Sequence, residues 1–454
     1  MIDTKKVGAT IQAFRKNMNY TQDKLAELLR VSPQAVSKWE NGHTLPDTYL
    51  LPALARIFDC TIDGILMPAA VFDEAAQSDV QAERIANRVV MKMESKRENA
   101  LRFDDDAIAE AVIQRYNIMG CVTVARGKTS RAEGYIKTPI VVSASRDEIK
   151  LTELVYHKRD NEFRGYALLN DYVSELPFAY RIDHAKKALL LESTDDTHFR
   201  GYDFNEENEN GSKIRRSYPA IACGVASLHG ACWENGSAFG RIGLPWHFEE
   251  KENMLAWIKD AMEKPFKKYK ASEANGKIPE EGMMGFESCG VSLGKNDITE
   301  KQMAYYEMAL EYLKAEYPKR IDSRFHAGKN ITIIHGDLHP GQLLFPGDES
   351  KGILFTGLQA VRMGLGTEDL AMLLALHIAP DRSKAQPILD AYYNCLSEKV
   401  SGYSYDEFIS DYKLSVAENL FFPVRLINRG IYDFNMQDRT LKAFETVVLE
   451  DAEI

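Results

Sequence analysis

Cysteine is scarce in this 454-residue sequence, and its six cysteines are scattered without a CxxC pair. The sequence therefore lacks the spacing of a structural zinc site or a redox motif, and we expect buried or free thiols in a reducing cytosol. No apolar run reaches the roughly 18 residues of a membrane span, and the N-terminal segment has no signal-peptide core. These absences predict a cytoplasmic protein that has no membrane partner.

Positive charge is also in short supply. The net charge is −11, and residues 1–67 carry 8 basic and 7 acidic side chains, so the acidic excess lies in the rest of the chain. Because an acidic surface repels nucleic acid, any contact with DNA has to come from residues 1–67. The length exceeds that of one ordinary core and predicts a multidomain protein.

Residues 1–67 have the pattern of an all-α domain with five short helices. Apolar residues recur at helical spacing over Thr4–Asn17, and Thr21 and Ser32 are natural N-caps for the next two helices. Asp47–Phe58 and Thr61–Leu66 supply the last two. Two short helices joined by a tight turn form a helix-turn-helix, whose second helix enters the major groove of DNA.

The second helix of this motif carries outward side chains that suit DNA. Gln34 can bond adenine through two hydrogen bonds, and Lys38 can reach guanine or a phosphate. Gln22 and Asn41 are placed for contacts with the DNA backbone. The predicted DNA-binding set is Gln22, Ser32, Pro33, Gln34, Ser37, Lys38 and Asn41.

The run TQDKLAELLRVSPQAVSKWENGHTLPDTYLLPALARIFDCTIDGIL resembles the Xre/phage-repressor helix-turn-helix family along its whole length. The resemblance implies a double-stranded DNA operator as the partner. It also implies a buried ion pair between Arg15 and Glu40 that is structural and does not read DNA. A five-helix interaction module without DNA binding stays an alternative, and the modest charge of +1 favours it.

Residues 68–103 form a charged connector that lacks glycine. A weak apolar stripe, Val80, Ile85, Val89 and Met93, has helical spacing. The connector is either a solvated linking helix or a dimerisation helix, which would suit a homodimer on a two-fold operator.

Beyond the connector the pattern predicts an α+β domain with two lobes. Residues 104–192 alternate strand-like runs with an amphipathic helix and form the small lobe, an antiparallel sheet. Residues 193–454 are mainly helical and form the second lobe. The stretch GKTS at 127–130 lacks the GxxxxGK[ST] spacing of a phosphate-binding loop, so we expect a turn between the first strands.

The motif IIHGDLHPGQLLF places Asp337 where a phosphoryl-transfer enzyme holds the side chain that accepts the substrate hydroxyl proton. The run resembles the aminoglycoside phosphotransferase/choline-kinase-like superfamily, as do ALLLES (188–193), VASLHGACW (225–233) and GLGTEDLAMLL (364–374). The resemblance implies a kinase-like fold, ATP as the nucleotide and an asparagine at the metal site, where this chain has Gln342. It also implies that Asp369 braces the backbone of the catalytic loop.

The sequence departs from that family at the metal. Counting back twelve residues from Asp369, the metal-binding aspartate is replaced by Gly357. Magnesium prefers carboxylate oxygens, so this loss argues against a bound Mg²⁺, unless Glu368 or Asp369 substitutes. No third ligand joins His335 and His339, so a zinc site is not expected.

Lys158 is the candidate for pairing with phosphate, with Glu162 as its helix partner, and Lys150 and Lys137 are rivals. The insert at 245–325, which contains Trp246 and Trp257, should line the ligand site.

The sequence therefore predicts a transcriptional regulator whose C-terminal domain is a pseudokinase that senses a small molecule or nucleotide. An active phosphotransferase acting on a hydroxyl is the alternative, regulated by the N-terminal domain. A non-enzymatic interaction protein without a specific operator is the third interpretation.

Overall fold

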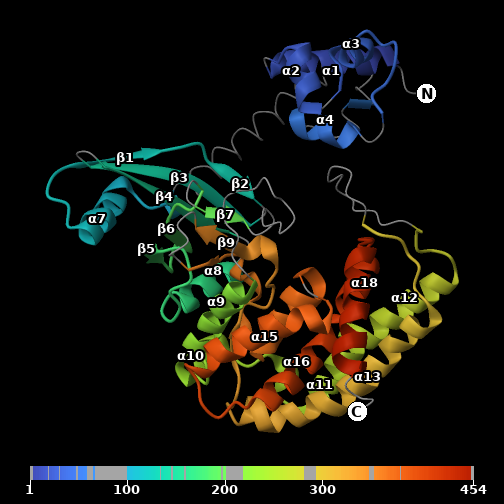
Figure 1. Cartoon of the computed structure of the whole chain (residues 1–454). Helices are drawn as coiled ribbons and strands as arrows, with labels where there is room; N and C mark the ends of the chain where they lie inside the picture. The colour runs from blue at the N-terminus through green and yellow to red at the C-terminus, as the bar shows by residue number, and fades with distance from the viewer. Residues whose placement is uncertain are drawn as a thin grey trace. The chain divides into compact units, whose positions relative to one another are not determined.

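The computed structural model divides the chain into two compact units, Met1–Ala100 and Leu101–Ile454 (Figure 1). The residues that it describes are 4–18, 20–29, 31–47, 50–58, 65–66, 100–132, 134–144, 147–157, 160–195, 198–200, 218–280, 293–346, 352–378 and 380–450. Among the helices in these ranges, none combines the length and the apolarity that crossing a membrane requires.

The first unit contains four described helices, α1 (Thr4–Asn17), α2 (Gln22–Leu29), α3 (Pro33–Glu40) and α4 (Leu51–Phe58). Their buried core includes Val7, Ile11, Leu25, Val36, Trp39 and Leu54. The Ser32 hydroxyl caps α3 by accepting a hydrogen bond from the Ala35 N–H at 3.2 Å. The first three helices are confirmed, whereas α4 begins at Leu51 and is shorter than predicted. Most of the fifth predicted helix, 61–66, and of the connector, 68–103, lies outside the described residues.

The small lobe of the second unit is an antiparallel sheet, as predicted, and it carries two helices. Its strands are β1 (Val122–Arg126), β2 (Ser130–Ala132), β3 (Tyr135–Ala144), β4 (Asp147–Tyr156), β5 (Ala179–Asp183) and β6 (Ala188–Glu192). They run in the order β1-β3-β4-β6-β5, and β2 pairs with β3. The GKTS stretch forms the expected turn between β1 and β2.

The two faces of this sheet are covered by different helices. Alternate residues of a strand point to opposite faces, so Leu190 packs in the same cluster as Ile108 of α7 (Asp105–Tyr116). Leu189 packs instead in the main core with Phe163 of α8 (Asp160–Leu169). The sheet thus joins the core of the helical lobe through one face only.

The second lobe is mainly helical (Figure 1). Its helices are α9 (Tyr218–Ala231), α10 (Gly236–Ile242), α11 (Lys251–Ile258), α12 (Lys264–Ala274), α13 (Glu300–Arg320), α14 (Gly366–Leu373), α15 (Arg382–Ser397), α16 (Tyr405–Asn419), α17 (Phe421–Ile427) and α18 (Phe434–Ala443). Short 3₁₀ and π segments join or extend them: η3 (Trp246–Phe248), η4 (Lys259–Glu263), η5 (Ile321–His326), η6 (Pro340–Gln342), η7 (Leu358–Ala360), η8 (Leu374–Ile378) and η9 (Phe444–Leu449). The short strands are β7 (His198–Arg200), β8 (Thr332–Ile334), β9 (Leu343–Pro346), β10 (Leu354–Phe355) and β11 (Arg362–Gly364). The second unit therefore has the two-lobed, kinase-like architecture that the resemblance implies.

Two cysteines correct the expectation of free thiols. Cys223 of α9 and Cys395 of α15 form a disulfide, with their Cα atoms 5.4 Å apart. The pairing could not be predicted from the sequence, because the two cysteines are 172 residues apart and only the packing of α9 against α15 brings them together. Cys121 and Cys232 are free.

Candidate functional site

The recognition helix α3 exposes the side chains that were expected to read DNA. Gln34 and Lys38 are exposed, and Ser37 is half-buried beside them. Pro33 is also exposed, in the first turn of the helix, where its missing N–H costs nothing. Asn41 caps the other end, because its side-chain amide donates to the Ser37 carbonyl at 2.8 Å. The surface of α3 thus presents the amide of Gln34 and the cation of Lys38, which are long enough to donate hydrogen bonds to base edges or phosphates.

Arg15 and Glu40 form the buried pair that the resemblance implies. The guanidinium donates to both carboxylate oxygens of Glu40, at 2.6 and 2.9 Å. Gln22, which was expected to contact the DNA backbone, donates its side-chain N–H to Glu40 at 2.8 Å. Burial acts to raise the pKa of Glu40, but the hydrogen bonds from Arg15 and Gln22 outweigh it and hold that pKa below its ordinary value. The pair fixes α1 against α3.

The loop that follows β8 is held by a buried carboxylate. Asp369 accepts the backbone N–H of His335 at 2.7 Å and that of Gly336 at 2.8 Å. His229 Nε2 lies 3.0 Å from the same carboxylate, and its Nδ1 lies 2.8 Å from the Tyr392 hydroxyl. Asp369 thus occupies the bracing position that the resemblance implies. Within the described residues, the partners of Asp369 are two backbone N–H groups and His229, so both of its carboxylate oxygens are already engaged.

Asp337 projects from this braced loop with one oxygen engaged. Gln359 Nε2 donates to its Oδ2 at 2.8 Å. The preceding Gly336 has φ +77°, and a Cβ there would collide with the Ala360 carbonyl, so only glycine fits this bend. The geometry therefore presents a carboxylate at the position expected for a catalytic base.

The residues at the expected metal position do not fit a magnesium ion. Gly357 has φ +71°, and a Cβ built on it would overlap the carboxamide of Gln342. Thr356 Oγ1 lies 3.4 Å from Gln342 Oε1, so neutral groups fill the space where the family places its anionic ligand. Within the described residues, no group of three or more His, Cys, Asp or Glu side chains could hold a metal ion.

Glu368, the other proposed substitute ligand, is also engaged. Its carboxylate pairs with Arg362 at 2.5 Å and accepts the Leu365 N–H at 2.7 Å. Burial acts to lower the pKa of Arg362, yet the Glu368 charge and hydrogen bond raise it overall. Both carboxylate oxygens of Glu368 therefore already accept hydrogen bonds from the protein.

The described candidate residues for phosphate pairing belong to β3, β4 and α8 of the small lobe. Lys158 lies outside the described residues, and Glu162 is half-buried on α8. Lys150 is exposed on β4. The rival Lys137 is paired with Asp195, with both carboxylate oxygens 2.8 Å from its Nζ. The assignment of a phosphate-binding lysine stays a prediction.

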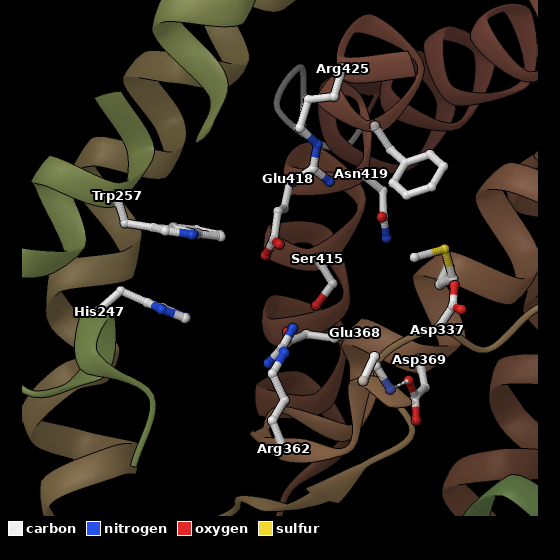
Figure 2. Close-up of a pocket in the computed structure, with 14 residues that line it drawn as sticks. His247, Trp257, Asp337, Arg362, Glu368, Asp369, Ser415, Glu418, Asn419 and Arg425 are labelled. Carbon is white, nitrogen blue, oxygen red and sulfur yellow. Dashed lines mark hydrogen bonds and ion pairs between the residues drawn. The ribbon is translucent and has the colours of Figure 1, made fainter. Parts of the chain in front are cut away.

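A cavity of about 320 Å³ opens beside Asp337 (Figure 2). Its lining residues are His247, Trp257, Gly336, Asp337, Ala360, Arg362, Glu368, Asp369, Met372, Ser415, Glu418, Asn419, Phe422 and Arg425. Trp257 was among the expected lining residues. Trp246 was too, but it is 51% exposed and does not line this cavity. Asn419 and Arg425 were not foreseen, although their spacing with Ser415, Glu418 and Phe422 places all five on one helical stripe.

Two aromatic rings form the wall opposite this stripe. The rings of His247 and Trp257 are stacked, 4.6 Å between centroids at 12°, and Figure 2 shows both pointing toward the side chains of α16. Burial, with help from the Arg362 charge, lowers the pKa of His247 to about 3, so this ring is neutral. The opposite side carries Glu418, whose carboxyl accepts a hydrogen bond from the Tyr317 hydroxyl. Burial and the nearby Glu368 raise the pKa of Glu418 to about 7.

Comparison with known proteins identifies the first unit. The family model HTH_3, described as helix-turn-helix, matches residues 11–65. These residues are a helix-turn-helix domain. The same domain is 43% identical over 56 residues to the HTH-type transcriptional activator BcrR of Enterococcus faecalis, and 38% identical over 60 residues to the HTH-type transcriptional regulator DicA of Escherichia coli. These matches cover 12% and 13% of this chain, and 28% and 44% of the relatives.

The second unit is similar to solved kinases. One is a choline/ethanolamine kinase family protein from Mesorhizobium loti, with a TM-score of 0.37 and 13% identity. That similarity covers 76% of this chain and 93% of the other.

Proposed function

We propose that this protein is a DNA-binding transcriptional regulator whose kinase-like domain senses a small molecule and does not transfer phosphoryl groups. The helix-turn-helix domain and its two regulator relatives support the first half. The observation that carries the second half is the overlap between Gln342 and any side chain at Gly357. Without an anionic ligand there, the metal that neutralises charge in phosphoryl transfer has no site of the family's kind.

Two features of the kinase-like domain support the sensing role. The loop bearing Asp337 is braced by Asp369, and a cavity remains beside it. A ligand in this cavity changes DNA affinity only if it binds the DNA-competent and DNA-free states with different affinities. Coupling of this kind typically amounts to about 1–3 kcal/mol, or 5- to 150-fold in affinity.

One observation favours the alternative of an active hydroxyl phosphotransferase. Asp337 stands on the braced loop and faces the cavity, as a catalytic base would. The two proposals differ in whether magnesium matters.

Two measurements on the full chain separate them. The first is a thermal shift with ATP, with and without Mg²⁺, since a ligand at about 100 times its Kd stabilises by about 2.7 kcal/mol. The second selects an operator from random duplex DNA and measures its affinity with and without each ligand. A shift that needs Mg²⁺, together with phosphorylation of a hydroxyl substrate that is lost in Asp337→Asn, would overturn the pseudokinase proposal. Absence of any selected DNA sequence would overturn the regulator proposal.

A further inference from the structure

One helical stripe supplies most of one wall of the cavity beside Asp337. Ser415, Glu418 and Asn419 lie on α16, and Phe422 and Arg425 continue the stripe on α17. Residues three and four apart share one helix face, so the sequence directs a polar stripe inward where core helices normally place apolar residues. A polar inward face next to a cavity requires partners for its hydrogen-bonding groups.

Several members of this wall have partners inside the protein. The Ser415 hydroxyl lies 2.9 Å from that of Thr367 and also donates to the Asp411 carbonyl. Glu418 accepts a hydrogen bond from Tyr317. The Arg362–Glu368 pair is satisfied as described above. These groups already have hydrogen-bond partners in the protein and do not need a ligand to supply one.

Asn419 and Arg425 are different. Asn419 is only 8% exposed, and Arg425 is half-buried. Over the described part of the chain, neither side chain makes a hydrogen bond or ion pair, and Arg425 only rests 5.4 Å from the Phe422 ring centroid. A buried polar group left without a partner destabilises the fold, and a charged group does so more strongly. Both residues line the same cavity as Trp257 and His247 (Figure 2).

The charges around Arg425 favour an anion with a single charge. Burial lowers the pKa of Arg425, and Arg429 and Arg362 lower it further although Glu418 opposes them, so the guanidinium is not fully compensated. A carboxylate matches the guanidinium fork and can also accept the Asn419 N–H. A phosphate dianion would meet the Asp337 carboxylate in the same cavity, and like charges repel.

The remaining walls define the rest of the ligand. The stacked His247 and Trp257 rings offer an apolar surface for a planar body. Gln359 occupies Oδ2 of Asp337, which leaves Oδ1 to accept a hydrogen bond from a ligand hydroxyl.

We propose that this cavity binds a small monocarboxylate with a planar body and a hydroxyl group, the carboxylate held by Arg425 and Asn419 and the hydroxyl donating to Asp337. This inference rests on the proposed sensing function and names the ligand class of that site. It does not require the ligand to change DNA affinity.

A matched set of three probes tests it by calorimetry on the full chain without DNA. The probes are 4-hydroxyphenylacetate, its neutral amide 4-hydroxyphenylacetamide, and the cation tyramine. We expect the acid to bind about tenfold or more tightly than the amide, since a hydrogen bond between two charged groups is stronger than one to a neutral group. Arg425→Gln should reduce acid binding to about the level of the amide and weaken amide binding much less.

Arg429→Gln is the control. Arg429 is exposed, lies one helical turn beyond Arg425 and does not line the cavity, so this variant removes the same charge without removing the contact. Asn419→Ala gives a second, milder loss of acid binding with Arg425 in place. Circular dichroism melts check that each variant is folded.

Four outcomes overturn the inference: the amide binding as tightly as the acid, tyramine binding most tightly, Arg429→Gln weakening the acid as much as Arg425→Gln, or no probe binding at about 10 mM. Acid binding that leaves operator affinity unchanged would instead sustain the inference and overturn the sensing function.

Discussion

The carboxamide of Gln342 fills the space into which a side chain at Gly357 would project. In the sequence the two positions are separate departures from the kinase-like family, an asparagine lengthened to glutamine and an aspartate reduced to glycine. In the structure they form one arrangement, because the longer amide occupies the room that the missing carboxylate leaves. Restoring a metal ligand therefore requires both positions to change.

Gly357→Asp alone should destabilise the kinase-like domain without creating a metal site. The new side chain meets Gln342 and needs a φ near +71°, and such a non-glycine conformation costs about 1–3 kcal/mol. Adding Gln342→Asn removes the clash, so the double variant should recover part of that loss and gain a Mg²⁺-dependent thermal shift with ATP. Gln342→Asn alone is the control and should show no magnesium effect. Additive losses in the double variant would show that the two residues are not coupled.

DNA affinity should depend on the exposed face of α3. Gln34→Ala with Lys38→Ala removes one amide and one cation four residues apart, and each well-placed base contact contributes about 1–3 kcal/mol. We expect at least a tenfold loss of affinity for a selected operator, measured by fluorescence anisotropy at fixed salt.

The matched control for this variant lies in α1. Gln12→Ala with Lys16→Ala removes the same residue types at the same spacing from α1. Gln12 also helps to hold the pKa of Glu40 below its ordinary value, so a thermal melt checks that this variant is folded. Its affinity should stay within about threefold of the parent protein. Equal losses in the two double variants would mean that charge alone drives binding, as in the alternative of a module without an operator.

Breaking the Arg15–Glu40 pair should loosen the helix-turn-helix domain. Arg15→Met leaves Glu40 buried with only the amides of Gln22 and Gln12 beside it, and removing one partner of a buried pair costs about 3–5 kcal/mol. Hydrogen exchange of α1 and α3 in the full chain should accelerate, while α16 keeps its protection. Because the folded-state pKa of Glu40 is lowered, its stabilising contribution is present above the unfolded value near 4.3 and is lost as pH falls through the folded value. Unchanged exchange in α3 at neutral pH would contradict this role.

Features that depend on nearby residues could be predicted from the sequence, whereas features that depend on contacts between distant segments could not. The cap at Ser32 depends on a neighbour three residues away, so the sequence contains the whole interaction. The Cys223–Cys395 bond and the pairing of Gln342 with Gly357 depend on how separate segments pack. The stripe from Ser415 to Arg425 was visible as a spacing, but nothing local indicates that it faces a cavity. That orientation is fixed by Trp257 and His247, which lie more than 150 residues earlier in the chain.

Glu418 should make the stability of the kinase-like domain depend on pH near neutrality. Its pKa is raised to about 7 in the folded protein, against about 4.3 for an unfolded glutamate, so the folded state holds this proton more tightly. Stability from this group is therefore fully present below about pH 4 and is lost as pH rises through 7, by an amount on the order of 3 kcal/mol.

Glu418→Gln keeps an acceptor for Tyr317 and removes the charge, so urea unfolding should find it more stable than the parent at pH 8 and similar at pH 5. Glu311→Gln, at an exposed position on α13, should leave the difference between the two pH values unchanged. A parent protein with equal stability at both pH values, or a Glu418→Gln variant less stable at pH 8, would show that the carboxyl is ionised and stabilising in the fold.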